Sequence, residues 1–173
     1  MHVPGFGGRR FISTIAIACL AALALLIAPA SAAPPRCATS GLVVWLDTQG
    51  NGAAGSVYYE LMLTNLSGHA CTLAGYPGVS AVDLTGRRLG SPASRNAAHT
   101  SRTVTLANGA SAKAVLRIVD VANYPASRCR PVTAAGLRVY PPNQAAAKVV
   151  PFPFRACSRS GPVYLTVEAV QRA

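Results

Sequence analysis

Acidic residues are scarce in this chain of 173 residues, which has five Asp and Glu residues against 16 Lys and Arg residues. Glycoside hydrolysis needs two carboxylates on either side of one substrate bond. The five acids fall mostly at the ends of expected strands or on their outward faces, which argues against a glycosidase. They are Asp47, Glu60, Asp83, Asp120 and Glu168.

Motifs that carry enzymatic or cofactor chemistry are also missing. The sequence has no G-x-S-x-G nucleophile elbow, no C-x-x-C pair and no glycine-rich phosphate loop leading into a helix. After residue 32, His69 and His99 are the only histidines and Met62 the only methionine, too few for a copper or zinc site. We therefore expect no cofactor and no enzymatic activity. A small secreted hydrolase with His69 or His99 as its base is the alternative.

The first 32 residues have the three-part layout of a secretory signal peptide. Arg9 and Arg10 precede an apolar run over residues 11–28, and a proline and several small residues follow. We expect export by the general secretory route and cleavage after Ala32, which leaves a domain of residues 33–173 with 14 basic and five acidic residues, a net charge of +9. A retained membrane anchor is the alternative, because the apolar run could almost span a bilayer.

Four cysteines remain after removal of this segment. An even number of cysteines in an exported chain predicts disulfides rather than a metal site. Cys37 precedes one expected strand and Cys71 follows the next, and in an antiparallel hairpin two such positions lie opposite each other. Cys129 and Cys157 flank a second pair of strands in the same way. We therefore predict the disulfides Cys37–Cys71 and Cys129–Cys157.

The rest of the sequence predicts eight or nine short strands. Residues 57–65 and 111–119 alternate apolar and polar side chains with the period of two that strands require. Residues 102–120 predict a hairpin around the turn Asn108-Gly109, and residues 122–135 predict at most one helical turn. Prolines within residues 148–155 place that strand at a sheet edge. We predict one antiparallel, all-β sandwich of two sheets, immunoglobulin-like in outline.

Two local patterns have a structural and a functional interpretation. The stretch LTNLSGHACTLAGYPGVSAVD, residues 63–83, joins two expected strands, and we interpret Gly75-Tyr76-Pro77 as a bend beside a disulfide. The alternative is a loop that binds a ligand through Tyr76. In the last expected strand, residues 162–170, Tyr164 is predicted to face away from the side that carries Val163 and Leu165.

Four arginines gather in one region of the sequence. We interpret them as solvated surface residues, and the alternative is a contact surface for a polyanion such as an anionic cell-wall polymer. We expect no nucleic-acid partner, because the aromatic residues of the expected strands are not interleaved in the sequence with these arginines. The four are Arg87, Arg88, Arg95 and Arg102.

The order of the segments resembles a known family. A cysteine near the mature start, then YELMLTN, CTLAGYPGV, DLTGRRLG, LANGASAKAVL, CRP, LRVYPP and a last cysteine are similar to the exported actinobacterial family called domain of unknown function 4232. The resemblance implies a four-cysteine β-sandwich displayed on, or released from, the envelope of high-GC Gram-positive bacteria, and it implies no activity. Unlike the many family members that look like lipoproteins, this chain has no cysteine at the expected cleavage site.

These observations together predict a secreted or envelope-associated, non-catalytic module that binds a ligand or has a structural role. The candidate partners are an anionic wall polymer and an envelope protein. We expect no membrane span after removal of the signal.

Overall fold

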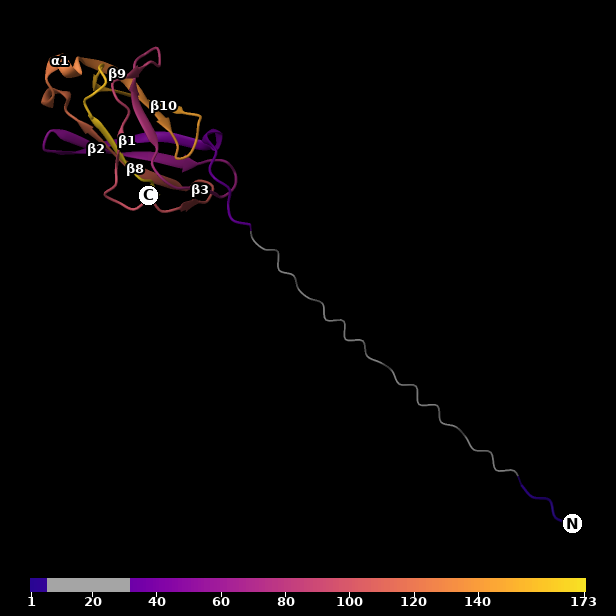
Figure 1. Cartoon of the computed structure of the whole chain (residues 1–173). Coiled ribbons are helices and arrows are strands. Elements are labelled where there is room, and N and C mark those ends of the chain that lie inside the picture. The colour runs from indigo at the N-terminus through magenta and orange to yellow at the C-terminus, as the bar shows by residue number, and fades with distance from the viewer. Residues whose placement is uncertain (6–31) are drawn as a thin grey trace. The chain divides into compact units, whose positions relative to one another are not determined.

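The computed structural model describes residues 1–5 and 32–173 of the chain (Figure 1). The signal peptide expected over residues 1–32 therefore lies almost entirely outside the described residues. Ala33–Ala173 forms one unit. Among the described residues, no helix has the length and apolar character needed to cross a membrane.

Strands dominate this unit, and its helices are single turns, so the chain is all-β as predicted. The strands are β1 (Leu42–Ala53), β2 (Ser56–Asn65), β3 (Cys71–Leu73), β4 (Gly78–Val82), β5 (Arg88–Leu89), β6 (Ser94–Asn96), β7 (Val104–Leu106), β8 (Ser111–Val119), β9 (Pro131–Tyr140), β10 (Lys148–Cys157), β11 (Leu165–Glu168) and β12 (Gln171–Arg172). The helical turns are η1 (Thr39–Gly41), η2 (Val121–Asn123) and α1 (Ala126–Cys129).

The strands form two larger sheets and one small one. The six-stranded sheet has the order β1-β2-β8-β11-β6, with β12 also paired to β8, and the four-stranded sheet has the order β10-β9-β4-β5. Figure 1 shows β9 and β10 on one side and β1, β2 and β8 on the other. A two-stranded sheet joins β3 and β7. The pairing is antiparallel except between β11 and β6.

The described part of the chain has twelve strands, more than the eight or nine that we predicted. The strands that the sequence did not indicate are β3, β6 and β12, and each has only two or three residues. An alternation with a period of two needs at least four residues to be recognised. β10 lies at a sheet edge, as its two prolines predicted.

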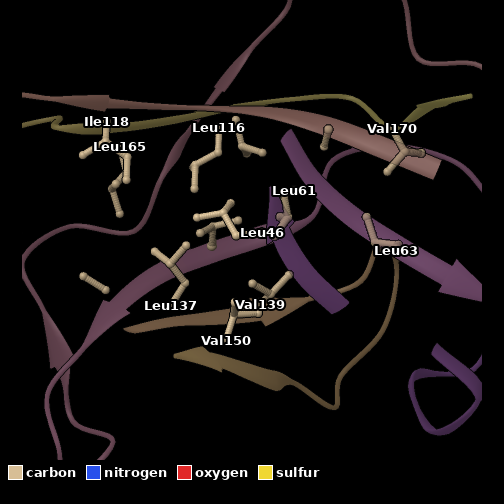
Figure 2. Packing of buried hydrophobic residues seen from close by; sticks show 14 of the residues in the cluster. Leu46, Leu61, Leu63, Leu116, Ile118, Leu137, Val139, Val150, Leu165 and Val170 are labelled. Carbon is tan, nitrogen blue, oxygen red and sulfur yellow. The ribbon is translucent and has the colours of Figure 1, made fainter. Parts of the chain in front are cut away.

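Side chains from both larger sheets meet in one core (Figure 2). Leu61 and Leu116 come from the six-stranded sheet and Leu137 and Val139 from the four-stranded sheet, and all four are fully buried. Along β8 the alternating buried side chains are Ala112, Ala114, Leu116 and Ile118, the inward set that the alternation predicted, and Val119 at the end of the strand is buried as well. Fully burying one such aliphatic side chain contributes about 1.5 to 3 kcal/mol, so this core is the main source of stability.

Two disulfides connect Cys37 with Cys71 and Cys129 with Cys157. These are the two pairs that the hairpin argument predicted. All four cysteines are buried, with at most 2% of each residue exposed. The first disulfide attaches the segment before β1 to β3, and the second joins the end of α1 to the end of β10.

The stretch of residues 63–83 is a corner, as we interpreted it, since it leads from β2 in the six-stranded sheet to β4 in the four-stranded sheet. Asn65, at the end of β2, is completely buried and organises this corner. Its Nδ2 donates to the carbonyls of His69 at 2.8 Å, Leu106 at 3.0 Å and Ala107 at 3.2 Å. Its Oδ1 accepts from the backbone N–H and the hydroxyl of Ser67 at 3.0 and 2.7 Å.

The hairpin predicted over residues 102–120 is wrong. A turn does form at Asn108-Gly109, but the strand before it, β7, pairs with β3, and the strand after it, β8, pairs with β2. The turn is bonded to Asn65, whose carbonyl accepts from Gly109 N–H at 2.7 Å and whose N–H donates to the carbonyl of Ala110 at 2.9 Å. The N–H of Gly109 and the carbonyl of Ala110 are thus bonded to Asn65 and not across a hairpin, and the two arms lie in different sheets.

The orientation predicted for Tyr164 is also wrong. Its side chain is completely buried, and its hydroxyl donates to the carbonyl of Leu89 at 3.0 Å. Val163, predicted to share the side of Leu165, is 49% exposed, whereas Leu165 is buried. The reason is that β11 begins only at Leu165, so the strand alternation does not extend to these two residues.

Candidate functional site

An aromatic pocket opens between the tip of the β1–β2 hairpin, the end of β8 and the edge strand β10. We use this name for a cavity of about 490 Å³ whose walls include Tyr59, Ile118, Phe152, Phe154 and Arg155. Both larger sheets contribute residues, so the pocket lies where the apolar interior of the sandwich reaches the surface. Its volume is in the range of small-ligand sites.

Three half-buried aromatic rings form the apolar wall of this pocket. The rings of Tyr59 and Phe152 meet edge to face, with centroids 5.1 Å apart and planes at 71°. Phe152 and Phe154 stack at 5.7 Å. The register of β10 against β9 shifts between Pro151 and Phe154, and such a bulge re-aims the side chains around it. The rings therefore retain exposed apolar area that a ligand could cover.

The hairpin tip at the rim is fixed by hydrogen bonds to the segment after β8. Ala54 and Gly55 turn the chain with φ values of 43° and 75°, typical of a two-residue hairpin turn. The carbonyl of Gly55 accepts from the backbone N–H of Asp120 at 2.8 Å and from Asn123 Nδ2 at 3.1 Å. These bonds hold the tip over the pocket at a fixed distance from β8.

The pocket has few charged groups. Arg155 is exposed and takes part in none of the salt bridges of the described residues. Asp120 is also in the lining, and its carboxylate accepts from the backbone N–H of Ala122 at 3.0 Å. The lining thus combines an apolar wall with one cation, Arg155, and one carboxylate, Asp120, neither of which is in a salt bridge of the described residues. The wall is chemically suited to the apolar body of a ligand.

A second hollow, the Tyr76–Arg95 cleft, lies beside the Gly-Tyr-Pro bend. We use this name for a space of about 420 Å³ lined by Tyr76, Arg95, Ser101, Tyr140, Gln144 and their neighbours. The guanidinium carbon of Arg95 lies 5.5 Å from the ring centroid of Tyr76, a cation–π arrangement.

Segments far apart in the chain meet at this cleft because the corner is fixed by hydrogen bonds. Gly75 has a φ of 104°, a conformation that strongly favours glycine, and its carbonyl accepts from the N–H of Val170 at 2.9 Å. Asn143 Nδ2 donates to the carbonyl of Ala74 at 3.0 Å. The bend thus joins the turn after β9 to the segment after β11.

The four arginines singled out in the sequence lie on different parts of the fold. Arg87 and Arg88 lie at the β4–β5 turn of the four-stranded sheet, Arg95 lies on β6 of the six-stranded sheet, and Arg102 lies between β6 and β7. Only Arg87 forms a salt bridge, from its Nε to Asp83 Oδ2 at 3.1 Å. The hydroxyl of Thr85 and then the donors of Arg87 lower the pKa of Asp83.

His69 and His99 are hydrogen-bonded to groups other than hydroxyls. His69 Nδ1 lies 3.1 Å from the carbonyl oxygen of Ser67, and His99 Nδ1 lies 3.0 Å from Glu168 Oε2. Within the described residues, neither ring nitrogen lies within hydrogen-bond distance of a serine or threonine hydroxyl. In the same part of the chain no group of three or more His, Cys, Asp or Glu side chains is arranged to hold a metal.

The fold defines a small, disulfide-linked β-sandwich, and the aromatic pocket and the Tyr76–Arg95 cleft are ligand-sized hollows at its surface. A family model described as "Domain of unknown function (DUF4232)" matches residues 37–171, and the chain belongs to this family. Neither the curated proteins nor the solved structures gave a match.

Sequence reasoning did not identify the pocket residues as a site. Tyr59, Phe152 and Phe154 were assigned to strands, and the available signal was that the three aromatics fall on half-buried faces and that two of them flank Pro153 of the edge strand. The contact of Tyr76 with Arg95 has no sequence signal, since it depends on how β6 lies beside the corner.

Proposed function

We propose that this chain is a secreted, non-catalytic binding module of the bacterial cell envelope, and that its aromatic pocket binds an amphiphile. The ligand has an aliphatic or aromatic body that contacts Tyr59, Phe152 and Phe154, and an anionic head that pairs with Arg155. The observation that carries this proposal is the cavity of about 490 Å³ that opens between the two sheets.

The apolar wall supports this choice of ligand. Ligand pockets are lined mainly by apolar and aromatic side chains, with few polar groups that fix orientation. Each 100 Å² of apolar surface removed from water is worth about 2.5 kcal/mol, before the cost of immobilising the ligand is subtracted. An acyl chain lying against three rings would therefore bind with useful affinity.

The charges of the molecule support an anionic head. The chain carries a formal net charge of +11, or +9 after the expected cleavage. Such an excess raises the local concentration of anionic ligands and their rate of association. Arg155 has no carboxylate partner among the described residues, so it can form a charge-assisted bond to a ligand.

Two features support a binding role rather than catalysis. His69 and His99 are hydrogen-bonded to a carbonyl and a carboxylate and not to a hydroxyl nucleophile, and the lining of the aromatic pocket contains no histidine. The two buried disulfides suit a protein that works in an oxidising compartment.

Titration calorimetry with laurate tests the proposal, with the cationic amphiphile dodecyltrimethylammonium as the comparison ligand. The domain should bind laurate, and Arg155→Gln should weaken binding by about fivefold or more through loss of one charge-assisted bond. Ala53→Trp, a bulky side chain at the rim, should block both ligands. The matched controls are Arg88→Gln, an exposed arginine outside the pocket, and Ala145→Trp, an exposed alanine elsewhere.

Equal loss of laurate affinity in Arg155→Gln and Arg88→Gln would show attraction by overall charge and would overturn the pocket assignment. Binding that is unaffected by Ala53→Trp, or the absence of any laurate binding, would also overturn it.

A further inference from the structure

The Tyr76–Arg95 cleft shares no lining residue with the aromatic pocket and has different chemistry. We propose that this cleft is a second binding site, which takes an acidic saccharide: Arg95 binds a carboxylate or phosphate of the sugar chain, and the tyrosines contact the sugar rings. This proposal does not depend on the amphiphile site.

Arg95 is positioned for an anion. Its guanidinium stacks over Tyr76, which restricts the side chain while the N–H donors at the edge of the guanidinium plane stay accessible. In the described residues, guanidinium hydrogen bonds come from Arg87, Arg117, Arg138 and Arg159, and Arg95 is not among them. An arginine whose orientation is restricted and whose N–H groups have no acceptor in the described residues is suited to bidentate recognition of a carboxylate or phosphate.

The neighbouring acid forms no salt bridge with Arg95. Glu168 lies on β11 beside β6 and borders, with Arg95, a hollow on the outer face of the six-stranded sheet. Its two oxygens are bonded to other groups, Oε1 to Asn96 Nδ2 at 3.2 Å and Oε2 to His99 Nδ1 at 3.0 Å. No salt bridge of the described residues includes Arg95.

The rest of the lining suits a sugar. The rings of Tyr76 and Tyr140 offer flat apolar faces, and the side chains of Ser101 and Gln144 offer hydroxyl and amide groups. A pyranose presents the same combination, with apolar C–H faces and hydroxyls around its edge. The exposed Arg102 directly follows Ser101 and adds a second cation to this loop.

The nucleic-acid alternative fits less well. Proteins that bind single-stranded DNA or RNA without sequence preference use aromatic side chains on which successive bases stack. Here one face of Tyr76 is already covered by Arg95, so Tyr76 offers only its other face for stacking and cannot lie between two successive bases. We therefore favour the saccharide over the nucleotide chain.

Affinity measurements with trigalacturonate test the proposal, because this probe has a carboxylate on every sugar. Neutral maltotriose and a short oligothymidylate are the comparison ligands. Arg95→Gln should weaken trigalacturonate binding by about tenfold or more, Arg95→Lys should restore it only in part because the planar fork is lost, and Arg88→Gln should change it by less than about twofold. Thermal unfolding of each variant checks that the fold is retained.

Three results would overturn the inference. They are equal effects of Arg95→Gln and Arg88→Gln, maltotriose affinity equal to that of trigalacturonate, and oligothymidylate affinity equal to or above it. The absence of trigalacturonate binding would overturn it as well. Arg155→Gln should leave this binding unchanged, so failure here and failure of the amphiphile site can be distinguished.

Discussion

Asn65 shows how one side chain can decide the path of the chain. It is fully buried, and its amide group bonds to carbonyls of His69, Leu106 and Ala107 and to two donors of Ser67. A buried polar group costs stability unless its bonds are made, and these bonds tie the end of β2 to the turn before β8. A single residue thus connects the small β3–β7 sheet to the six-stranded sheet.

Replacement of Asn65 by alanine should destabilise the domain strongly. The Nδ2 amide shares two N–H groups among three carbonyls. Only the bond to Leu106 is buried, and the carbonyl of His69 also accepts from Ser67 Oγ, so we expect a loss of about 1 to 3 kcal/mol. Urea unfolding would measure it. Asn51→Ala is the matched control, since Asn51 is exposed and its loss should change stability by less than about 0.5 kcal/mol. Similar values for both variants would contradict the role given to Asn65.

Tyr164 makes stability fall at alkaline pH. Burial raises the pKa of this phenol, so above about pH 10 the unfolded chain loses the proton while the folded chain retains it. The contribution of Tyr164 to the free energy of unfolding is fully present below the pKa that its phenol has in the unfolded chain. Above that pKa the contribution declines by about 1.4 kcal/mol per pH unit.

Tyr164→Phe should therefore reduce stability at neutral pH by about 1 to 2 kcal/mol, since the carbonyl of Leu89 loses its donor. The same variant should lose less stability than the wild type between about pH 9 and about pH 11. Urea midpoints at several pH values would measure both effects. Parallel curves for the two proteins over that range would refute the alkaline contribution.

At the scale of elements, the two disulfides hold different parts of the sandwich. Cys37–Cys71 ties the segment before β1 to the corner, where the N–H of Cys37 also donates to Thr72 at 2.9 Å. Cys129–Cys157 ties α1 to the end of the edge strand β10. The loops that they close are of similar length, with sequence separations of 34 and 28.

Removing either disulfide by a double Cys→Ala replacement should lower the free energy of unfolding by about 3 to 4 kcal/mol, because the unfolded chain gains loop entropy. The similar loop lengths predict that the two variants differ by less than about 0.5 kcal/mol from this source. Urea unfolding of both variants and the wild type would check it. A loss below about 1 kcal/mol in either variant would mean that its disulfide adds little.

The long strands could be predicted from sequence, and the connections between them could not. β2 and β8 have nine or ten residues, enough for the alternation of buried and exposed side chains to be visible. The Asn108-Gly109 turn was recognised, but the sequence does not say that Asn65, more than 40 residues earlier, binds it. The disulfide pairs were predictable because a hairpin brings the residue before one strand opposite the residue after the next.

At the scale of the whole molecule, both candidate sites lie where elements from different sheets meet. The aromatic pocket joins β2 and β8 to β10, and the Tyr76–Arg95 cleft joins β6 to the bend before β4 and the turn after β9. The residues of the aromatic pocket are far apart in sequence, which is why composition and motifs did not find it. Tyr76 and Arg95 were each singled out, one in the alternative ligand loop and one in the arginine group, but the sequence does not say that they meet. Basic charge indicated an anionic partner, and the four arginines offered as its contact lie on different parts of the fold.

The proposed export of the chain leads to a prediction about its thiols. The full sequence has five cysteines, and cleavage after Ala32 would remove Cys19 and leave the four that form disulfides. Protein collected from the medium of a secreting Gram-positive host should begin at Ala33. It should react with iodoacetamide at no cysteine before reduction and at four after it.

A retained signal would instead leave Cys19 available to react before reduction and five cysteines after it. Replacing both Ala30 and Ala32 by leucine should produce this retained form, because the peptidase needs small residues at these positions, whereas Ser31→Ala should still be cleaved. Intact-mass spectrometry distinguishes the two products. Since the disulfides lie wholly within Ala33–Ala173, the retained form should unfold at the same urea concentration as the cleaved one. A lower midpoint for the retained form would mean that the first 32 residues disturb the sandwich.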